Sequence, residues 1–233
     1  MDNKITQLVF ILDRSGSMAG KEEDTIGGFN SLLAEQKKLK DEAYLTTVLF
    51  DDKYEVLHKH LPLSDAAPMT DQQYYTRGCT ALLDAIGRTI TDMKHYQKSL
   101  PRAKRSNKVM FTIITDGWEN ASCEYTGPKI KEMVTKQQTK GWEFFFIGAN
   151  IDAFTVAEDM GIRRSRAVNY APDSQGTRTN YRAMSTNCCN YRTHRKINEK
   201  AWKEDIEDYL AQNTAVAPKA KSTTKTPAKD KSK

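Results

Sequence analysis

The chain has 233 residues, 38% of them hydrophobic and 28% charged, which is polar for a folded protein but too apolar for disorder over the whole length. Its formal net charge is +6, but residues 214–233 hold six lysines against one aspartate and so carry +5 of that charge. The remaining +1 over residues 1–213 does not predict a basic, nucleic-acid-binding face on the folded part.

The cysteines and the hydrophobic runs indicate the cellular compartment of the protein. Cys79 and Cys123 are isolated, and Cys188 and Cys189 are adjacent, a spacing that disulfide geometry resists, so no disulfide framework is expected. Asp13 interrupts the first apolar run, which argues against a signal peptide. No stretch approaches the roughly 18 apolar residues of a membrane span. We therefore expect a cytoplasmic protein without a membrane segment.

The first part of the chain predicts a strand, a polar loop, a helix and a pair of strands. Apolar residues fill Gln7–Leu12, as in a strand buried on both faces. The spacing of apolar residues in Asp24–Leu39 predicts an amphipathic helix. Two strand-like segments follow, Leu45–Phe50 and Tyr54–His58, and their short connection predicts an antiparallel pair, since a parallel return needs a crossover of about a dozen residues.

The later part of the chain predicts helices that alternate with strands. After an irregular loop, the expected elements are helices at Ala81–Tyr96, Pro128–Lys140 and Ile151–Met160, and strands at Trp142–Ile147, at Arg166–Tyr170 and in the run from Lys108 to Asp116. This alternation predicts an α/β fold with a doubly wound, Rossmann-like sheet, mostly parallel, with one antiparallel edge strand and helices on both faces. Residues 171–213 are less regular, because Arg178–Arg192 has few apolar residues, although Trp202–Leu210 predicts a final helix.

A carboxylate and two hydroxyls follow the first predicted strand. Asp13, Ser15 and Ser17 alternate along the loop that leaves this strand, and Gly16 gives the backbone freedom for a tight turn. In an open α/β sheet, ligand sites gather at the carboxyl ends of the strands. Three oxygen-bearing side chains at that place suit a hard cation such as Mg²⁺. The alternative is that Ser15 or Ser17 only caps the following helix.

Two later residues complete a recognisable pattern. Thr80 opens the helical segment Thr-Ala-Leu-Leu-Asp-Ala-Ile-Gly, and Asp116 ends a second apolar strand. Together with Asp13, Ser15 and Ser17, they resemble the metal-ion-dependent adhesion site of von Willebrand factor A (vWA) domains, and the resemblance covers roughly the first two-thirds of the chain. The residues around the motifs are similar to those of stand-alone intracellular bacterial and phage members.

The resemblance implies a division of the chain. We expect a vWA domain over residues 1–212, in which residues 170–212 form a C-terminal helical extension. Residues 213–233 are expected to be a disordered tail rich in Lys, Thr, Pro and Ala. A tail of this composition buries too little apolar surface to offset the entropy lost on ordering.

The resemblance further implies a function in binding. The hydroxyls of Ser15, Ser17 and Thr80 would contact Mg²⁺ directly, with Mn²⁺ or Ca²⁺ as alternative cations. Asp13 and Asp116 would act largely through water, and Asp116 would move into direct contact when no partner is bound. The remaining coordination position would accept an Asp or Glu carboxylate from a partner protein. The chain is therefore expected to be a monomeric protein-interaction module and not an enzyme.

Other functions remain open from the residues alone. A Mg²⁺-dependent phosphohydrolase of the haloacid-dehalogenase type also begins with an Asp at a strand end, but it needs a second Asp where this chain has Ser15. The lysines of residues 214–233 suit a nucleic-acid or anionic-surface binder, whose affinity would fall steeply with salt. His58 and His60 are expected on one strand face, but with the other two histidines unplaced they do not predict a zinc site.

Three aromatic residues are expected on loops near the predicted metal site. Tyr74, Tyr75 and Trp118 are candidates for contact with a partner, although a packing role is equally open for Trp118.

Three polar residues near the predicted site have local structural interpretations. Asp84, one helical turn after Thr80, either orients Thr80 or stabilises the first turn of its helix. Glu119 and Asn120 are expected to serve the start of a helix and not to bind the metal.

Overall fold

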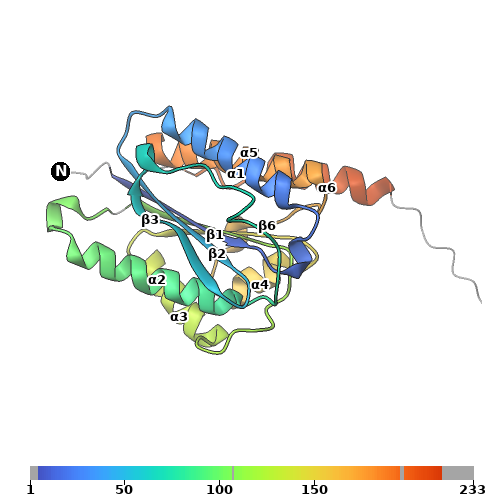
Figure 1. The fold of residues 1–233 in the computed structure, drawn as a ribbon, viewed down its shortest axis with the longest axis horizontal. Helices are drawn as coiled ribbons and strands as arrows, with labels where there is room; N and C mark the ends of the chain where they lie inside the picture. Colours follow the sequence, from blue (N-terminus) through green and yellow to red (C-terminus); the bar gives the residue numbers. More distant parts are fainter. Residues whose placement is uncertain (1–4, 107, 195–196, 217–233) are drawn as a thin grey trace, which may run out of the picture.

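The computed structural model describes residues 5–106, 108–194 and 197–216. Its centre is a six-stranded sheet in the order β3-β2-β1-β4-β5-β6 (Figure 1). β3 runs antiparallel to β2, and each of the other neighbouring pairs is parallel. The strands are β1 (Thr6–Asp13), β2 (Ala43–Phe50), β3 (Tyr54–Pro62), β4 (Lys108–Thr115), β5 (Glu143–Gly148) and β6 (Ala167–Asn169). The predicted α/β fold with one antiparallel edge strand is confirmed.

Helices cover both faces of this sheet, with α1, α5 and α6 on one side and α2, α3 and α4 on the other (Figure 1). They are α1 (Glu22–Lys37), α2 (Leu82–Ser99), α3 (Gly127–Gln138), α4 (Ala153–Asp159), α5 (Ser174–His194) and α6 (Glu204–Val216). Every residue of β1 is buried, as expected for a parallel strand covered on both faces. Alternate residues of β1 enter different cores: Leu8 and Phe10 face α1 and α5, and Val9 and Ile11 face α2 and α3.

α5 is a long helix that the apolar pattern did not predict, although it covers much of one face of the sheet. Its inner face carries Tyr181, Met184, Cys188 and Tyr191, all buried and at helical spacing. Buried polar residues such as Asn187 lie between them and dilute the apolar signal. The sequence of this helix is therefore polar on average, even though the helix is a core element.

α5 packs along α1. A Cβ on Gly28 of α1 would come within 2.5 Å of the Tyr181 ring, so the ring lies directly on the backbone of α1. At the other end of α5, Arg192 donates from Nε to Asp41 Oδ2 (3.0 Å) and from Nη1 to the carbonyl oxygen of Gln36 (2.6 Å). Residues of α5 thus share a core with β1 and α1. The expected division of the chain, in which residues 170–212 form a C-terminal extension, stays a prediction.

The edge strand β3 separates two histidines that were expected on one face. The register between β2 and β3 shifts on both sides of Thr47, and His60 has a φ of +49°. His58 stacks on Phe29 of α1, whereas His60 stacks on Tyr96 of α2. The prediction of a common face is therefore wrong, because an irregularity breaks the two-residue period of the strand.

The C-terminal end differs from the prediction at its boundary. α6 continues to Val216, so residues 213–216, which were expected in the disordered tail, belong to this helix. The rest of the predicted tail, residues 217–233, lies outside the described residues.

In the described ranges no helix has the length and apolar character needed to cross a membrane. The four cysteines are free thiols.

Two adjacent glycines of α1 test the packing of α1 against α5. Gly28→Ala should lower the free energy of unfolding by roughly 1–3 kcal/mol, because the new methyl group overlaps the Tyr181 ring. Gly27→Ala should raise it by roughly 0.5–1 kcal/mol, because a Cβ there has no neighbour within 4 Å and alanine loses less entropy in a helix. Urea denaturation of both variants measures the difference. Equal effects of the two substitutions would contradict this packing.

Candidate metal centre

The loop after β1 gathers the three hydroxyls predicted as ligands. Residues 16–18 form one 3-10 turn, and the Oγ atoms of Ser15 and Ser17 lie 3.0 Å apart. Thr80, 65 residues further along the chain, donates from Oγ1 to Ser15 Oγ at 3.0 Å. The three hydroxyls therefore form one cluster at the carboxyl end of β1.

The two predicted carboxylates follow neighbouring strands. Because β1 and β4 pair in parallel, Asp13 at the end of β1 and Asp116 just after β4 reach the same edge of the sheet. Asp13 Oδ1 accepts from the Ser15 N–H at 2.7 Å, and Asp13 Oδ2 accepts from Thr115 Oγ1 at 2.6 Å. Asp116 Oδ1 is buried without a hydrogen-bond partner, whereas Oδ2 contacts the ammonium of Lys21.

Gly117 brings the loop after β4 against the hydroxyls. A Cβ at this position would lie 2.8 Å from Ser17 Oγ and 3.1 Å from Thr80 Oγ1. The backbone next to Asp116 therefore needs glycine to approach this closely. All five predicted residues come together from three separate segments of the chain.

Burial dominates the electrostatics of Asp13. Loss of water raises its pKa from the ordinary 3.8 to about 6, against the lowering effect of the hydrogen bonds from Thr115 and Ser15. The nearby charge of Asp116 raises this pKa further. Two buried carboxylates so close together favour a compensating cation between them.

The loop after β4 also stabilises the start of α2. Asn120 Oδ1 accepts from the Thr80 N–H at 2.8 Å, and Glu119 Oε2 accepts from the Leu83 N–H at 2.9 Å. Both residues lie in the loop after β4 and not at the start of the next helix, α3, so they stabilise the start of α2 across the chain. Asp84 lies in the first turn of α2, as the second of its two predicted roles requires. Its carboxylate also accepts from the backbone N–H groups of residues 123–125, which fastens the loop after β4 to α2.

Two of the three aromatic residues predicted near the site are exposed. Tyr75 is 42% exposed and Trp118 is 61% exposed, so the packing role that was open for Trp118 is not observed. Tyr74 is buried, and its hydroxyl donates to the backbone carbonyl of Asp13. The predicted contact role of Tyr74 is therefore wrong, because this residue anchors the segment before Thr80 to the end of β1.

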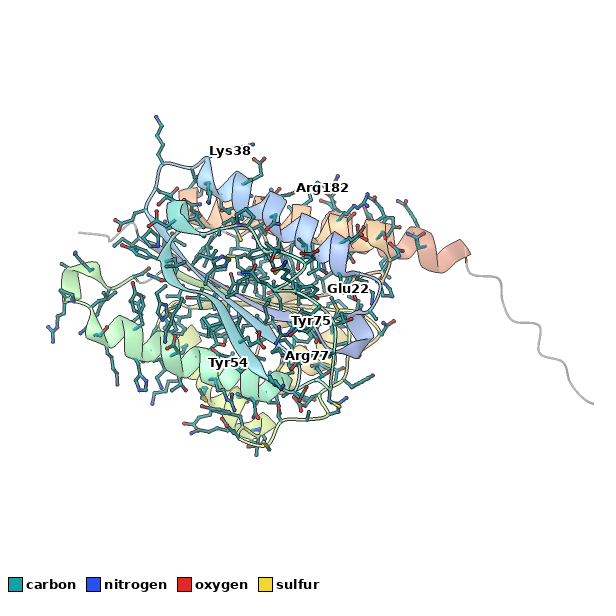
Figure 2. The ribbon with its side chains drawn as sticks, viewed as in Figure 1. Glu22, Lys38, Tyr54, Tyr75, Arg77 and Arg182 are labelled. Atoms are coloured by element: carbon teal, nitrogen blue, oxygen red, sulfur yellow. The ribbon has the colours of Figure 1, made fainter. Side chains whose placement is uncertain are left out.

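An ion-pair network, missed by sequence reasoning, surrounds the fully buried Arg14. Arg14 Nε donates to Asp51 Oδ2 at 2.9 Å, and Nη1 donates to Glu55 Oε2 at 2.9 Å. Arg77 contacts the same two carboxylates, each at 2.7 Å. Both guanidinium groups lie against the ring of Tyr75, and Figure 2 shows Tyr75 and Arg77 together at this end of the sheet.

This network joins the loop after β1, the turn between β2 and β3, and the segment before Thr80. Hydrogen bonds from Arg14 and Arg77 lower the pKa of Glu55 to about 2. One sequence signal was present, because an arginine directly after a buried strand needs a buried acceptor. The spacing along the chain could not indicate which carboxylate would accept from it.

Lys21 is the other important residue that sequence reasoning missed. Its ammonium contacts Asp116 and donates to the carbonyl oxygen of Ser17 at 3.0 Å. Gly20, with a φ of +83°, turns the chain just before Lys21. A lysine so soon after the loop that carries Asp13, Ser15 and Ser17 (the metal loop) was a signal that its ammonium could lie near the site. The direction of its side chain, however, depends on the turn at Gly20.

The donor set fits a hard cation. Two carboxylates and three hydroxyls offer only oxygen atoms, which Mg²⁺, Mn²⁺ and Ca²⁺ prefer, and Asp116 Oδ1 is buried without a partner. Among the residues that the structure describes, no group of three or more His, Cys, Asp or Glu side chains is arranged to hold a metal ion. A cation at this edge would therefore depend on hydroxyls as well as on carboxylates.

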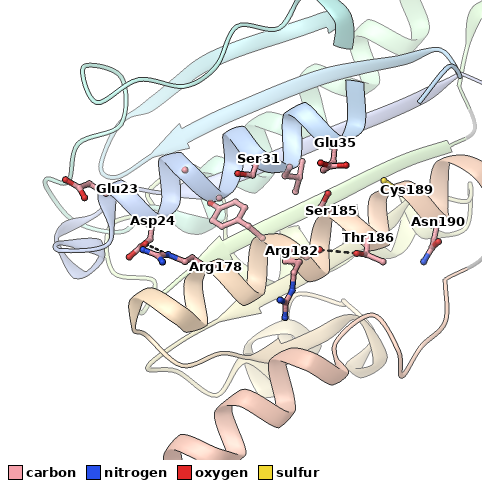
Figure 3. Close-up of a pocket in the computed structure, with 14 residues that line it drawn as sticks. Glu23, Asp24, Ser31, Glu35, Arg178, Arg182, Ser185, Thr186, Cys189 and Asn190 are labelled. Carbon is pink, nitrogen blue, oxygen red and sulfur yellow. Dashed lines mark hydrogen bonds and ion pairs between the residues drawn. The ribbon is translucent and has the colours of Figure 1, made fainter. Parts of the chain in front are cut away.

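A large groove lies away from these residues, between α1 and α5 (Figure 3). Its volume is about 860 Å³, and Asp24 and Arg178 form an ion pair of 2.8 Å at its wall. None of the five predicted ligands lines this groove. The candidate metal centre is thus a cluster of side chains at the carboxyl ends of β1 and β4, separate from this groove.

Comparison with solved structures shows a shared fold. The chain is similar to a von Willebrand factor type A protein from Catenulispora acidiphila (TM-score 0.54, 14% identity, 78% of this chain and 42% of that one). It is also similar to the manganese-loaded TRAP protein of Plasmodium vivax (TM-score 0.51, 18% identity, 72% and 69%). A third similar structure is the ArnB paralog VWA2 from Sulfolobus acidocaldarius (TM-score 0.52, 15% identity, 78% and 45%).

The chain spans less than half the length of the first and third of these structures. No protein-family model matches the sequence, and no curated protein matches it either. The resemblance predicted from the sequence is confirmed at the level of the fold.

Asp13→Asn tests how much the buried charge of Asp13 lowers the free energy of unfolding. The folded protein binds the Asp13 proton more tightly than the unfolded chain, so ionisation costs stability as the pH rises through about 6. In chelator, the variant should therefore be more stable than the wild type by up to roughly 3 kcal/mol at about pH 7.5, and by only roughly 0.5 kcal/mol at about pH 4. Denaturant titrations at both pH values measure this difference.

The exposed carboxylate of Asp71 provides the control, because Asp71→Asn should leave the stability unchanged at either pH. A gain from Asp13→Asn that is the same at both pH values would contradict the raised pKa.

Proposed function

Because this chain has the von Willebrand factor A fold, we propose that it is a protein-interaction module whose candidate metal centre binds Mg²⁺ and, through it, an acidic residue of a partner protein. The cation would be held by Asp13, Ser15, Ser17, Thr80 and Asp116. The observation that carries the proposal is the convergence of these five oxygen-bearing side chains, from three segments, at one edge of the sheet.

The chemistry of the donors supports a hard divalent cation. When bound, such a cation supplies an electrophilic centre that can accept a carboxylate from outside the chain. Three of the five donors are neutral hydroxyls, and carboxylates that act largely through water, as the resemblance implies, would leave the bound cation more electrophilic than carboxylates in direct contact. The manganese-loaded TRAP structure supports Mn²⁺ as an alternative, and Ca²⁺ is a third candidate.

The surroundings of the cluster support access by a partner. Ser17 is exposed, so the metal loop lies at the surface even though Asp13 and Asp116 are buried beneath it. Trp118 follows Gly117 directly and is 61% exposed, which offers a large aromatic contact beside the cluster.

The geometry favours binding over a phosphohydrolase reaction. In such an enzyme Asp13 would be the nucleophile, but here hydrogen bonds from the Ser15 N–H and from Thr115 Oγ1 engage both of its oxygens. The position two residues later carries a serine in place of a second carboxylate. We therefore propose binding, and not phosphoester hydrolysis, as the function of this site.

The cytoplasmic location, the monomeric state and the bacterial or phage origin remain predictions from the sequence. The same holds for a nucleic-acid or anionic-surface contact through the lysine-rich tail.

Ser17→Ala tests the metal site with little risk to the fold, because Ser17 is exposed. Loss of its hydroxyl should weaken Mn²⁺ binding by about tenfold or more, corresponding to about 1.4 kcal/mol. Calorimetric titration with Mn²⁺ measures the affinity, and Ser64→Ala, at an exposed serine after β3, provides the matched control. The same Mn²⁺ affinity in Ser17→Ala and wild type would count against Ser17 as a ligand.

Thr80→Val tests the link between the metal and the partner. A bait with this substitution should lose metal-dependent partner capture, because valine keeps the volume of Thr80 but removes the hydroxyl. Capture by the wild type should require Mg²⁺ and disappear in chelator. Thr91→Val, further along α2, should behave as the wild type. Capture that persists in chelator at full strength would contradict a metal-bridged interaction.

A further inference from the structure

Lys21 places a positive charge inside the candidate metal centre. Its side chain is 10% exposed, and the Asp116 carboxylate that it contacts is completely buried. The same ammonium donates to the carbonyl oxygen of Ser17 at 3.0 Å. Lys21 thus bridges the metal loop and the carboxylate after β4, the two sides between which a cation would lie.

The backbone of Lys21 is held independently of this ammonium. Its N–H donates to the Met18 carbonyl at 3.1 Å, and its carbonyl accepts from the Thr25 N–H at 2.9 Å. A flexible four-carbon stem separates this backbone from the charge. The ammonium can therefore leave Asp116 while the start of α1 keeps its conformation.

An ammonium and a divalent cation exclude each other at one carboxylate. In a buried site the repulsion between like charges a few ångströms apart is strong, because little water screens it. Asp116 Oδ2 is already engaged by Lys21, and a cation bound to this carboxylate would lie within reach of the same ammonium. Binding of the cation would therefore require Lys21 to move away.

We propose that Lys21 competes with the divalent cation for Asp116 and thereby sets a weaker metal affinity than the five ligands alone would give. This inference rests on the proposed metal site. A purely structural ion pair would stabilise the fold without affecting metal binding. The two roles predict different metal affinities for a variant that loses the charge of Lys21 and keeps its hydrogen-bonding capacity.

Lys21→Gln separates these roles. The glutamine side chain keeps N–H donors, but it carries no charge. If Lys21 competes with the metal, Lys21→Gln should bind Mn²⁺ about tenfold more tightly or better, and Lys21→Met, which also removes the donors, should do the same. Titration of Mn²⁺ at low ionic strength, followed by electron paramagnetic resonance, measures both affinities, and circular dichroism checks that each variant is folded.

Lys38→Met is the control for net charge. Lys38 follows α1 at the end far from Glu22 (Figure 2), and its ammonium pairs with the exposed Glu35. This substitution should leave the Mn²⁺ affinity unchanged. An equal gain from Lys38→Met would assign the effect to the overall charge and overturn the proposal.

The remaining outcomes separate this proposal from the proposed metal site. Equal Mn²⁺ affinity in wild type and Lys21→Gln would overturn the competition and leave the site intact. Binding by Lys21→Gln with none by wild type would support both proposals. Failure of all the proteins, Lys21→Gln included, to bind Mn²⁺ would overturn both.

Discussion

Two buried carboxylates at the ends of adjacent parallel strands are the constraint on which this edge of the molecule depends. β1 and β4 lie in the middle of the sheet and are covered on both faces, so Asp13 and Asp116 are held away from water and close to each other. Charges in such a place need donors or counter-ions. Thr115 and the Ser15 N–H supply donors to Asp13, and Lys21 supplies a cation to Asp116.

The same constraint explains why the surrounding loops are tied together so extensively. The segment before Thr80 has little regular structure, yet Tyr74 fixes it to the end of β1, and Arg77 fixes it to the turn after β2. Arg14 reaches that turn from the metal loop itself. Removal of one partner from such a buried network leaves another charge unpaired, so the three loops are coupled energetically. Rigid loops hold oxygen ligands in place at a lower entropic cost.

Stability and the proposed function oppose each other at this edge. The raised pKa of Asp13 means that its charged form destabilises the folded state, and Asp116 Oδ1 is buried without a partner. A neutral, well-packed residue would avoid both costs. Costs of this kind are typical of functional sites, and here they occur in two of the five residues that the vWA resemblance selects. A bound cation would relieve them.

The sequence by itself determined the fold class, because buried strands and amphipathic helices leave local patterns along the chain. The resemblance of its motifs to vWA domains selected the five oxygen-bearing residues that meet at this edge. Only the tertiary structure decided which distant side chains contact each other. Arg14 and Asp51 are 37 residues apart, and nothing in their spacing predicts the pair. α5 is a core helix with a polar sequence, and a register shift turns His58 and His60 to opposite faces. Lys21 reaches Asp116 across 95 residues. Local periodicity reports burial, whereas contacts between distant side chains depend on how the packed elements orient them.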